Sequence, residues 1–320
     1  MPETAPAAFP REQAPDGSFE RQVSRFRDWV RADPQAPYPA VAGRYHLYVS
    51  LACPWAHRTV IYRRLKGLED AVSMTVVDPE RDERGWAIVE GPGNTLDPVN
   101  GFAFLSEAYE ASAPGFEDRV TVPVLWDTVT GGIVNNESAD IIRMFDREFA
   151  AVAAPDAPVF CPPGLEGEID RINAVVYAHV NNGVYRAGFA TTQRAYERAF
   201  ADLFAALDAL DERLGERRYL LGDRITEADW RLFTTLVRFD PVYVGHFKCN
   251  LRRVADYPNL SGYLRDLYQQ PKVAATVDFD HIKRHYYRTH VTINPTRIVP
   301  VGPHMDLAVP HGRSALAARA

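Results

Sequence analysis

Residues 49–58 read VSLACPWAHR and mark the passage from a strand into a helix. The apolar run from Tyr45 to Val49 predicts the strand, and Pro54 fits the first helical turn, because its missing N–H would have no partner there. Cys53 is then expected at the helix N-terminus, where free N–H groups and the positive end of the helix dipole favour thiolate over thiol. Since the thiolate is the nucleophilic form, the pattern favours a catalytic cysteine over a buried structural one.

The bulk composition predicts a folded protein of about two domains. The chain has 320 residues, 46% of them hydrophobic, which is enough for real cores. A net charge of −6 and the lack of a Lys/Arg block argue against nucleic-acid partners. No window approaches 18 uncharged apolar residues, so we expect no membrane span, and the N-terminus lacks the apolar core of a signal peptide.

Cysteine usage favours a reducing, cytoplasmic location. The three cysteines, Cys53, Cys161 and Cys249, are too few and too scattered for a disulfide framework. Ala56 stands where a Cys-x-x-Cys motif would have its second thiol. Redox chemistry at Cys53 would therefore need a small thiol from solution to resolve a mixed disulfide. No catalytic role is assigned to the other two cysteines.

The order of expected elements divides the chain into five parts. The first half follows the order β-α-β and then β-β-α of a thioredoxin-like domain, with strands over 45–50, 71–78, 122–126 and 131–134 and helices over 54–66 and 137–149. A long irregular stretch separates the two halves of that pattern at 79–118. The five parts are an N-terminal extension (1–43), an α/β domain (44–149), an Ala/Pro-rich linker (150–164), an all-α domain (165–287) and an extended tail (288–320).

Helical periodicity dominates the second half. Helices are expected over 165–183, 227–238 and 257–269, and a fourth apolar face ends at Gly215, which suits a helix C-cap. Thr226 and Asp229 form a capping-box pattern. A short helix is also expected in the extension, around Phe19 to Val30.

Two further segments of the α/β domain suit a bound peptide. Pro123 opens a strand, and it is either an edge-strand proline or a cis-proline that frees the backbone of Val122 for a ligand. Glu137 and Ser138 open the next helix, where they either serve as ordinary helix-start residues or hold a ligand's ammonium and carboxylate groups. A γ-glutamyl group carries both charges on one carbon. Together with Cys53, these residues outline a glutathione site.

At this point the chain resembles the glutathionyl-hydroquinone reductases, the Xi class of glutathione transferases. The matching segments run from about residue 20 to 312 in the family's order, and those that carry tyrosines are specific to this class. They are residues 53–58, 85–86, 119–127, 135–138, 182–189, 238–240, 281–287 and 293–300.

The resemblance implies a thioredoxin-like N-terminal domain, an all-α C-terminal domain and a homodimer formed through the helical domains. It also implies that glutathione is the co-substrate. The residues implied to bind glutathione are Trp86, Arg119, Val122, Glu137 and Ser138.

Three tyrosines of the helical half complete the implied site. Tyr185, Tyr286 and Tyr287 would bind the hydroquinone, because a phenol packs on an aromatic ring while its O–H bonds a ring hydroxyl. By hypothesis, the Cys53 thiolate attacks the glutathionyl sulfur, and Tyr185 and Tyr286 assist the departing ring.

The sequence is open to three other interpretations. An omega-like thioltransferase would use Cys53 without the tyrosines, whereas a non-catalytic binding module would have an unreactive cysteine. His281 and His285, four positions apart, have the spacing of zinc ligands on a helix, but the cationic neighbourhood and the lack of a Glu-x-x-His pattern disfavour a metal site.

Overall fold

The structure is a computed structural model that describes residues 7–316. These residues divide into two compact units. A helical unit comprises residues 7–22, Phe160–Ala274 and 286–316, and an α/β unit comprises Val23–Val159 and Ala275–His285. The N-terminal extension thus contributes to both units, its division falling after Gln22.

The α/β unit is built on a sheet of four strands, β1 (Tyr45–Val49), β2 (Val72–Val76), β5 (Val124–Asp127) and β6 (Gly132–Asn135). The strand order is β2-β1-β5-β6, with β1 parallel to β2 and the other pairs antiparallel. All five residues of the central strand β1 are buried, as expected for an apolar run covered on both faces. This is the predicted thioredoxin-like arrangement.

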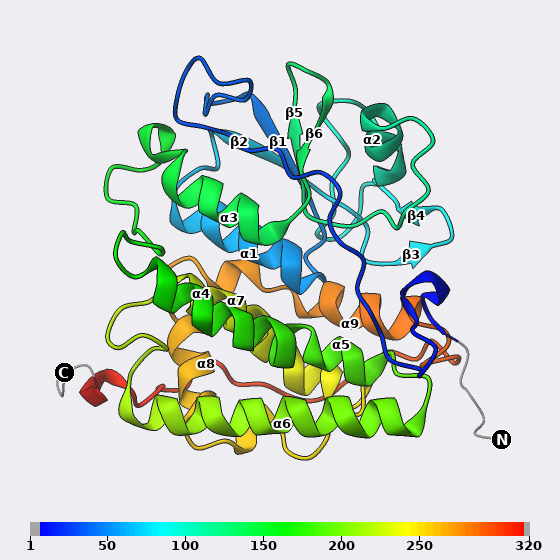
Figure 1. Ribbon diagram of the computed structural model, residues 1–320, viewed down its shortest axis with the longest axis vertical. Coiled ribbons are helices and arrows are strands. Elements are labelled where there is room, and N and C mark those ends of the chain that lie inside the picture. Colours follow the sequence, from blue (N-terminus) through cyan, green and yellow to red (C-terminus); the bar gives the residue numbers. More distant parts are fainter. Residues whose placement is uncertain (1–6, 317–320) are drawn as a thin grey trace. The chain divides into compact units, whose positions relative to one another are not determined.

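Helices α1 (Pro54–Leu65) and α3 (Ser138–Arg147) pack side by side in this unit (Figure 1), where the sequence predicted them. The stretch 79–118 is less irregular than expected. It contains the hairpin of β3 (Arg81–Asp82) and β4 (Gly85–Trp86) and the helix α2 (Leu105–Ser112), which packs against β6. The start of α2 is capped by Glu107, whose carboxylate accepts the Phe104 N–H at 2.9 Å.

The helix expected around Phe19 to Val30 is wrong. The backbone there bonds to the edge of the sheet instead of to itself: the Asp28 N–H donates to the Val134 carbonyl at 3.0 Å. Arg27 holds this pairing in place by donating to the Asp140 carboxylate of α3. The prediction rested on a helix-like spacing of apolar residues, but these side chains pack along an extended segment.

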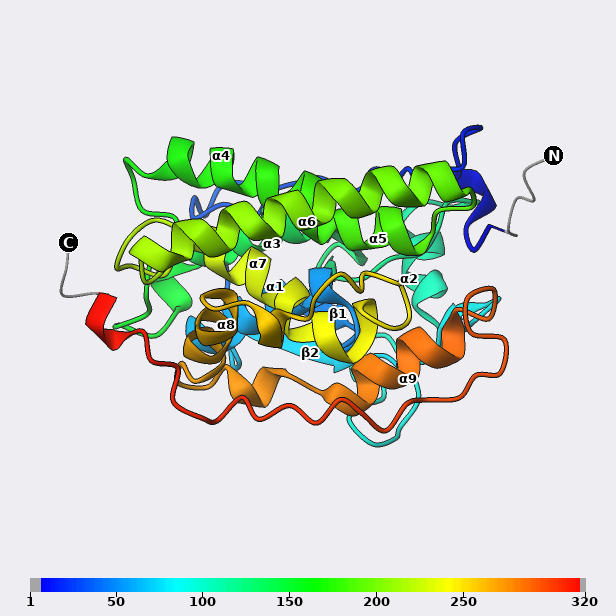
Figure 2. The same ribbon diagram turned by 90° about the horizontal axis from the view of Figure 1, so that it is seen from below.

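The helical unit is dominated by α6, which runs beside α5 in both views (Figures 1 and 2). Its elements are α4 (Glu166–Val175), the π-helix η3 (Val176–Asn181), α5 (Gly183–Gly188), α6 (Gln193–Glu216), α7 (Glu227–Arg238), the π-helix η4 (Phe239–Tyr243) and α8 (Leu260–Tyr268). The predicted capping box of α7 is confirmed: Asp229 accepts the Thr226 N–H at 2.7 Å. Helix α9 (Phe279–Thr289) contributes to both units, which divide after His285.

Short 3-10 helices complete the described secondary structure: η1 (Pro10–Glu12), η2 (Ala150–Val152), η5 (Val254–Asp256), η6 (Ala274–Thr276) and η7 (Ser314–Leu316). Within residues 7–316, no helix has the length and apolar character needed to cross a membrane.

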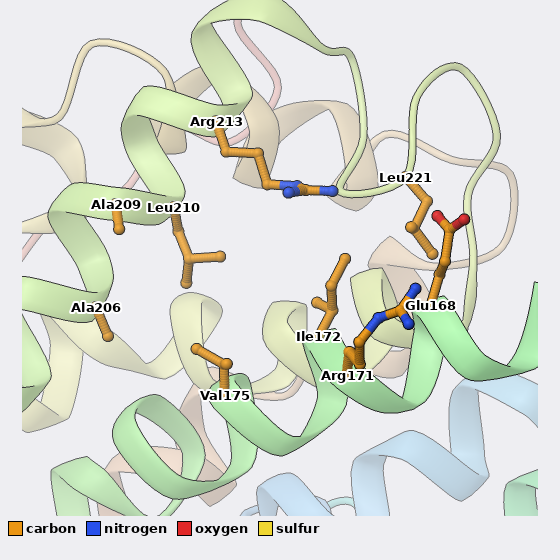
Figure 3. A pocket seen from close by; sticks show the side chains of 9 residues that line it. All are labelled: Glu168, Arg171, Ile172, Val175, Ala206, Ala209, Leu210, Arg213 and Leu221. Atoms are coloured by element: carbon orange, nitrogen blue, oxygen red, sulfur yellow. The ribbon is translucent and has the colours of Figure 1, made fainter.

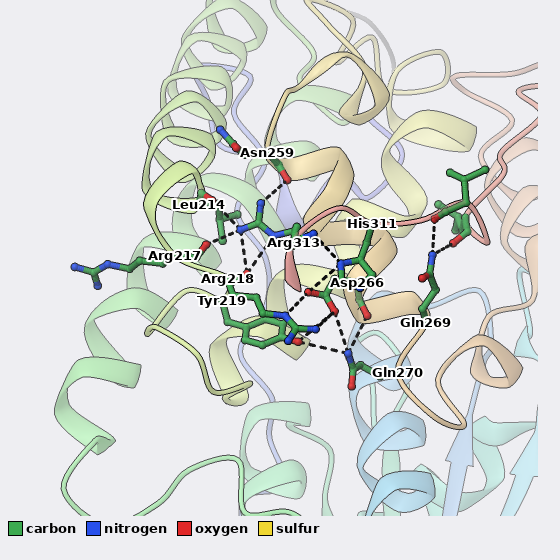
Figure 4. A network of polar contacts seen from close by, with 12 residues as sticks. Leu214, Arg217, Arg218, Tyr219, Asn259, Asp266, Gln269, Gln270, His311 and Arg313 are labelled. Carbon is green, nitrogen blue, oxygen red and sulfur yellow. Dashed lines mark hydrogen bonds and ion pairs between the residues drawn. The ribbon is translucent and has the colours of Figure 1, made fainter. Parts of the chain in front are cut away.

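The expected C-cap at Gly215 is also wrong, because α6 continues through Gly215 to Glu216. A side chain from the tail takes over the capping. The buried guanidinium of Arg313 donates to the carbonyls of Leu214 and Arg217 at 2.7 and 2.5 Å (Figure 4). The last carbonyls of the helix are thus satisfied without a left-handed glycine.

Candidate functional site

Cys53 is the N-cap residue of α1. Its backbone is extended (φ −80°, ψ 124°), and its carbonyl accepts the first helical bond, from His57 N at 3.0 Å. The thiol is partly exposed, whereas Cys161 and Cys249 are buried. Burial raises the pKa of the Cys249 thiol far above its usual range, so this side chain stays protonated. Cys53 alone combines accessibility with the positive end of a helix dipole.

Val122 lies directly beside this cysteine. The Cys53 Sγ donates to the Val122 carbonyl at 3.6 Å, and the Val122–Pro123 peptide bond is cis, as one of the two interpretations of the sequence held. Strand β5 begins one residue later, because proline has no N–H for the ladder. The thiol and a backbone segment suited to a bound peptide are therefore neighbours.

Glu137 and Ser138 stand at the start of α3. Glu137 is the N-cap, and its carboxylate accepts the Ala139 N–H at 3.0 Å. The buried Ser138 hydroxyl lies 3.4 Å from that carboxylate and accepts a hydrogen bond from Arg58 at 3.4 Å. The result is an acidic group beside a helix N-terminus and a buried guanidinium, which suits a ligand that carries both an ammonium and a carboxylate group.

Two contributors to this cluster were not predicted from the sequence. The first is Arg58, whose guanidinium lies 4.5 Å from the ring centre of Trp55 and reaches Ser138. The second is Ser24 of the N-terminal extension, whose hydroxyl donates to Glu137 at 3.1 Å. Arg58 was visible as part of the cysteine motif, but no local pattern marked Ser24.

Trp86 and Arg119 come from the long connection of the α/β unit. The Trp86 ring is 4% exposed and stacks on His285, with ring centres 5.0 Å apart. Its indole N–H is buried and has no hydrogen-bond partner among residues 7–316. Arg119 is half-buried, and its charge acts on the buried hydroxyl of Tyr109, which donates to the Thr121 carbonyl at 2.9 Å.

In the helical unit, three buried tyrosines form a chain of hydroxyls. The hydroxyls of Tyr185 and Tyr286 are 2.5 Å apart, and that of Tyr243 lies 3.0 Å from Tyr286. Burial raises the pKa of Tyr243 and of Tyr286 well above the usual range, while the buried cation of Arg238 opposes the shift. Both phenols therefore hold their protons at neutral pH.

Tyr243 was missed from the sequence, although it lies in the segment that follows Arg238-Phe239-Asp240. It lies in the π-helix η4, and the pattern of apolar residues does not predict which way a side chain in that helix points. Tyr287 is not brought into the chain of hydroxyls, because its O–H donates to the Pro241 carbonyl at 3.2 Å.

The two histidines with zinc-like spacing have other partners. His281 Nε2 lies 2.7 Å from the Pro92 carbonyl, and His285 Nδ1 lies 2.7 Å from the Pro79 carbonyl. Within the part of the chain that the structure describes, no three His, Cys, Asp or Glu side chains group as metal ligands would.

Comparison with known proteins gives the family. Residues 52–148 match the glutathione S-transferase N-terminal domain, and residues 193–266 match the C-terminal domain. The chain is 54% identical over 305 residues to glutathionyl-hydroquinone reductase YqjG of Escherichia coli, which covers 93% of this chain and 92% of the relative. It is 50% identical to glutathionyl-hydroquinone reductase PcpF of Sphingobium chlorophenolicum, with 91% of each chain covered. The chain belongs to the glutathionyl-hydroquinone reductases.

Solved structures place this reductase in the Xi class. A Xi-class glutathione transferase from Natrialba magadii has a TM-score of 0.90 at 52% identity, covering 94% of this chain and 96% of that one. The glutathione-bound structure of E. coli YqjG has a TM-score of 0.87 at 54% identity, covering 90% and 96%. The family and the fold predicted from the sequence are both confirmed.

A groove of about 490 Å³ in the helical unit of this reductase contains none of the predicted site residues (Figure 3). Its lining is mostly apolar, and the charged side chains that line it are those of Glu168, Arg171 and Arg213. Val175 from this groove is 48% exposed, which is high for an apolar side chain. The groove is lined by Glu168, Arg171, Ile172, Val175, Ala206, Ala209, Leu210, Arg213 and Leu221.

Proposed function

We propose that this protein removes glutathione from glutathionyl-hydroquinones and releases the hydroquinone and oxidised glutathione. The observation that carries the proposal is the partly exposed Cys53 at the N-terminus of α1, next to the Val122 carbonyl, in a chain of this family. Glutathione transferases that conjugate use Ser or Tyr at this point, whereas a cysteine can take the glutathionyl group onto its own sulfur.

In the first step, the Cys53 thiolate attacks the sulfur of the glutathionyl group. The new S–S bond forms as the bond between that sulfur and the ring carbon breaks, and the electron pair goes to the ring carbon. Cys53 is the N-cap residue of α1, where the positive end of the helix dipole would favour an attacking thiolate. The products are a Cys53–glutathione disulfide and a ring that needs a proton.

Tyr185 and Tyr286 supply that proton in the proposed mechanism. Their hydroxyls share a hydrogen bond of 2.5 Å, so negative charge left on one oxygen is stabilised by the other. Tyr243 extends this support through its 3.0 Å contact with Tyr286. Tyr287, whose hydroxyl is bound by Pro241, is proposed to contact the hydroquinone with its ring.

In the second step, another glutathione attacks the mixed disulfide. Its thiol proton returns to the tyrosine pair, its sulfur bonds to the glutathionyl sulfur, and Cys53 leaves as the thiolate. Oxidised glutathione is released. One substrate adduct and one glutathione thus give one hydroquinone and one oxidised glutathione, and the enzyme returns to its starting state.

Glutathione is proposed to bind along the α/β unit. Glu137 would pair with the γ-glutamyl ammonium group and Ser138 with its carboxylate, while Val122 offers its backbone to the cysteinyl unit. Trp86 and Arg119 would hold the rest of the tripeptide, with the unpartnered Trp86 N–H as one donor. The charges and donors described above support these roles.

The test is product analysis with a cysteine variant. Wild-type protein incubated with glutathionyl-menadiol and glutathione should form menadiol and oxidised glutathione in equal amounts, with ping-pong kinetics. Cys53→Ser should abolish turnover while glutathione affinity, measured by calorimetry, stays within about threefold. The matched control, Cys161→Ala, should retain activity. Cys53→Ser activity within tenfold of wild type would refute the assignment.

We also propose a cytoplasmic homodimer that forms through the helical unit. The apolar groove with exposed Val175 supports this face as the contact, since such a side chain gains from being covered. Sedimentation of wild type and Val175→Glu tests it. A dimer that survives the charge would place the contact elsewhere, and a monomeric wild type would exclude it. The five-part organisation given from the sequence remains our proposal for the domain boundaries.

A further inference from the structure

The N-terminal extension is firmly attached to the helical unit. The Gly17 carbonyl accepts the Thr191 N–H at 3.0 Å, and the Asp16 carbonyl accepts the Thr192 hydroxyl at 2.8 Å. A Cβ on Gly17 would meet the Thr192 side chain at 2.5 Å, so the two segments touch closely. Arg198 of α6 adds an ion pair with Asp16 at 2.7 Å. This anchoring fixes the position of the residues that follow.

One of these residues is Arg21, whose guanidinium carbon lies 4.7 Å from the ring centre of Tyr185. A second contact orients it: Arg21 Nε donates to Asn182 Oδ1 at 3.1 Å, three positions before the tyrosine. The same guanidinium lies 5.5 Å from the ring centre of Phe19. Contacts with Phe19 in its own segment and with Asn182 at the start of α5 thus hold Arg21 over the ring of Tyr185.

Two cations act on the tyrosine cluster, and they differ in position. Arg238 of α7 is buried and donates a hydrogen bond to the Thr234 carbonyl at 2.8 Å. Its charge lowers the pKa of Tyr243 and of Tyr286, against the larger effect of burial. Arg21 lies over the ring of Tyr185. A cation near a phenol ring favours the negative charge that the phenol carries after it gives up its proton.

We propose that Arg21 is a positioning residue that holds the Tyr185 ring and stabilises the negative charge left on the Tyr185–Tyr286 pair after proton transfer to the departing ring. This inference rests on the proposed function. It predicts that Arg21 affects the chemical step for a carbon leaving group. A thiolate leaving group needs no such proton, so release of a small thiol from a mixed disulfide should not depend on Arg21.

The test compares Arg21→Gln, Arg21→Lys and the control Arg198→Gln on two substrates. The substrates are glutathionyl-menadiol and the mixed disulfide of glutathione with 2-mercaptoethanol. Arg21→Gln should lower kcat for glutathionyl-menadiol about tenfold with KM within twofold, and leave disulfide turnover within twofold. Arg21→Lys, which keeps the charge, should recover most of the loss. Arg198→Gln removes one exposed ion pair of the extension but leaves its hydrogen bonds to Thr191 and Thr192 in place, so it should stay within twofold on both substrates.

Three results would overturn the inference: an Arg21→Gln kcat within twofold of wild type, equal losses on both substrates, or a Lys variant as slow as the Gln variant. If Arg21→Gln does not fold, Arg21→Lys decides alone, since a selective tenfold loss on glutathionyl-menadiol contradicts a role carried by charge. A wild type that does not process glutathionyl-menadiol at all defeats the proposed function and the inference together. Because that result comes from the wild type alone, a failure of the proposed function can be distinguished from a failure of the inference about Arg21, which only the variants test.

Discussion

The hydroxyls of Tyr185 and Tyr286 lie 2.5 Å apart, although 101 positions separate the two residues in the chain. Both side chains are buried, one on α5 and the other on α9. A contact this short between two neutral phenols means that one donates and the other accepts. The acceptor oxygen is thereby prepared to release its own proton, because the charge left behind is stabilised by the donor.

Removing the Tyr286 hydroxyl should therefore affect carbon and sulfur leaving groups differently. We expect Tyr286→Phe to lower kcat for glutathionyl-menadiol about 100-fold, within the range of lost general-acid catalysis, and to change turnover of a mixed disulfide less than about threefold. Steady-state kinetics on both substrates measures this difference. The control is Tyr287→Phe, whose hydroxyl donates to the Pro241 carbonyl and lies outside the chain of tyrosine hydroxyls, so its loss should cost less than threefold. A uniform loss on both substrates would speak against a proton-transfer role.

Ser24 should affect the binding of glutathione and not the chemistry. Its hydroxyl donates to Glu137 at 3.1 Å and orients the carboxylate proposed to meet the γ-glutamyl ammonium group. We expect Ser24→Ala to raise KM for glutathione about five- to tenfold with kcat unchanged, which corresponds to the roughly 1 kcal/mol of a typical hydrogen bond. Ser18→Ala serves as control, because Ser18 bonds Asp16 on the same extension. A lowered kcat with unchanged KM would contradict the assignment.

Features of the site that neighbouring residues determine could be predicted from the sequence, whereas features that depend on distant residues could not. Cys53, Pro54 and the start of α1 follow one another, so the local pattern sufficed, and the same holds for Glu137 and Ser138. Ser24 was not predictable, because its partner is 113 positions away and an extended segment has no periodic signal.

The two structural errors have a similar origin. Apolar spacing around Phe19 fits a helix locally, but the edge of the sheet offers partners for the backbone that the helix would otherwise supply. Gly215 suits a C-cap, but Arg313 reaches the same carbonyls from almost 100 positions further along the chain. In both cases a distant part of the chain satisfies groups that local rules assign to nearby residues.

Buried histidine should make the α/β unit sensitive to mild acid. His46 is fully buried between the hydroxyls of Ser73 and Thr75, at 2.7 and 2.9 Å, and burial lowers its pKa to about 4. The unfolded chain, with an ordinary histidine pKa near 6.5, binds the extra proton first as the pH falls. The contribution of neutral His46 to stability is thus complete above pH 6.5. Between pH 6.5 and 4 it is lost, and the free energy of unfolding falls by about 2–3 kcal/mol.

Denaturant unfolding at pH 7 and pH 4.5 checks this expectation. The free energy of unfolding of His46→Gln should fall less over this interval than that of wild type, because the amide keeps two polar contacts but does not titrate. His304→Gln, a change at an exposed position, should follow wild type. If His46→Gln shows the full wild-type loss, another group is responsible for the acid sensitivity.

The tail should stabilise the helical unit mainly through Arg313. Its guanidinium reaches four backbone carbonyls, including that of Asn259 at 3.3 Å, and is 4% exposed. We expect Arg313→Ala to lower the free energy of unfolding by about 3 kcal/mol, because buried carbonyls lose their donor, and Arg313→Lys to recover little, since an ammonium group lacks the planar fork. Chemical denaturation provides the measurement. Arg252→Ala, at an exposed ion pair, should cost less than 1 kcal/mol.

The shared use of the N-terminal extension has a practical consequence for anyone producing this enzyme. Starting expression at residue 44, just ahead of β1, would retain Cys53 and every segment matched to the glutathione transferase domains, so the shortened protein would look complete on paper. It would nevertheless lack the hydroxyl that orients Glu137 and the guanidinium that covers Tyr185. Weak activity of such a preparation would result from the missing extension and would say nothing about the chemistry of the full-length enzyme.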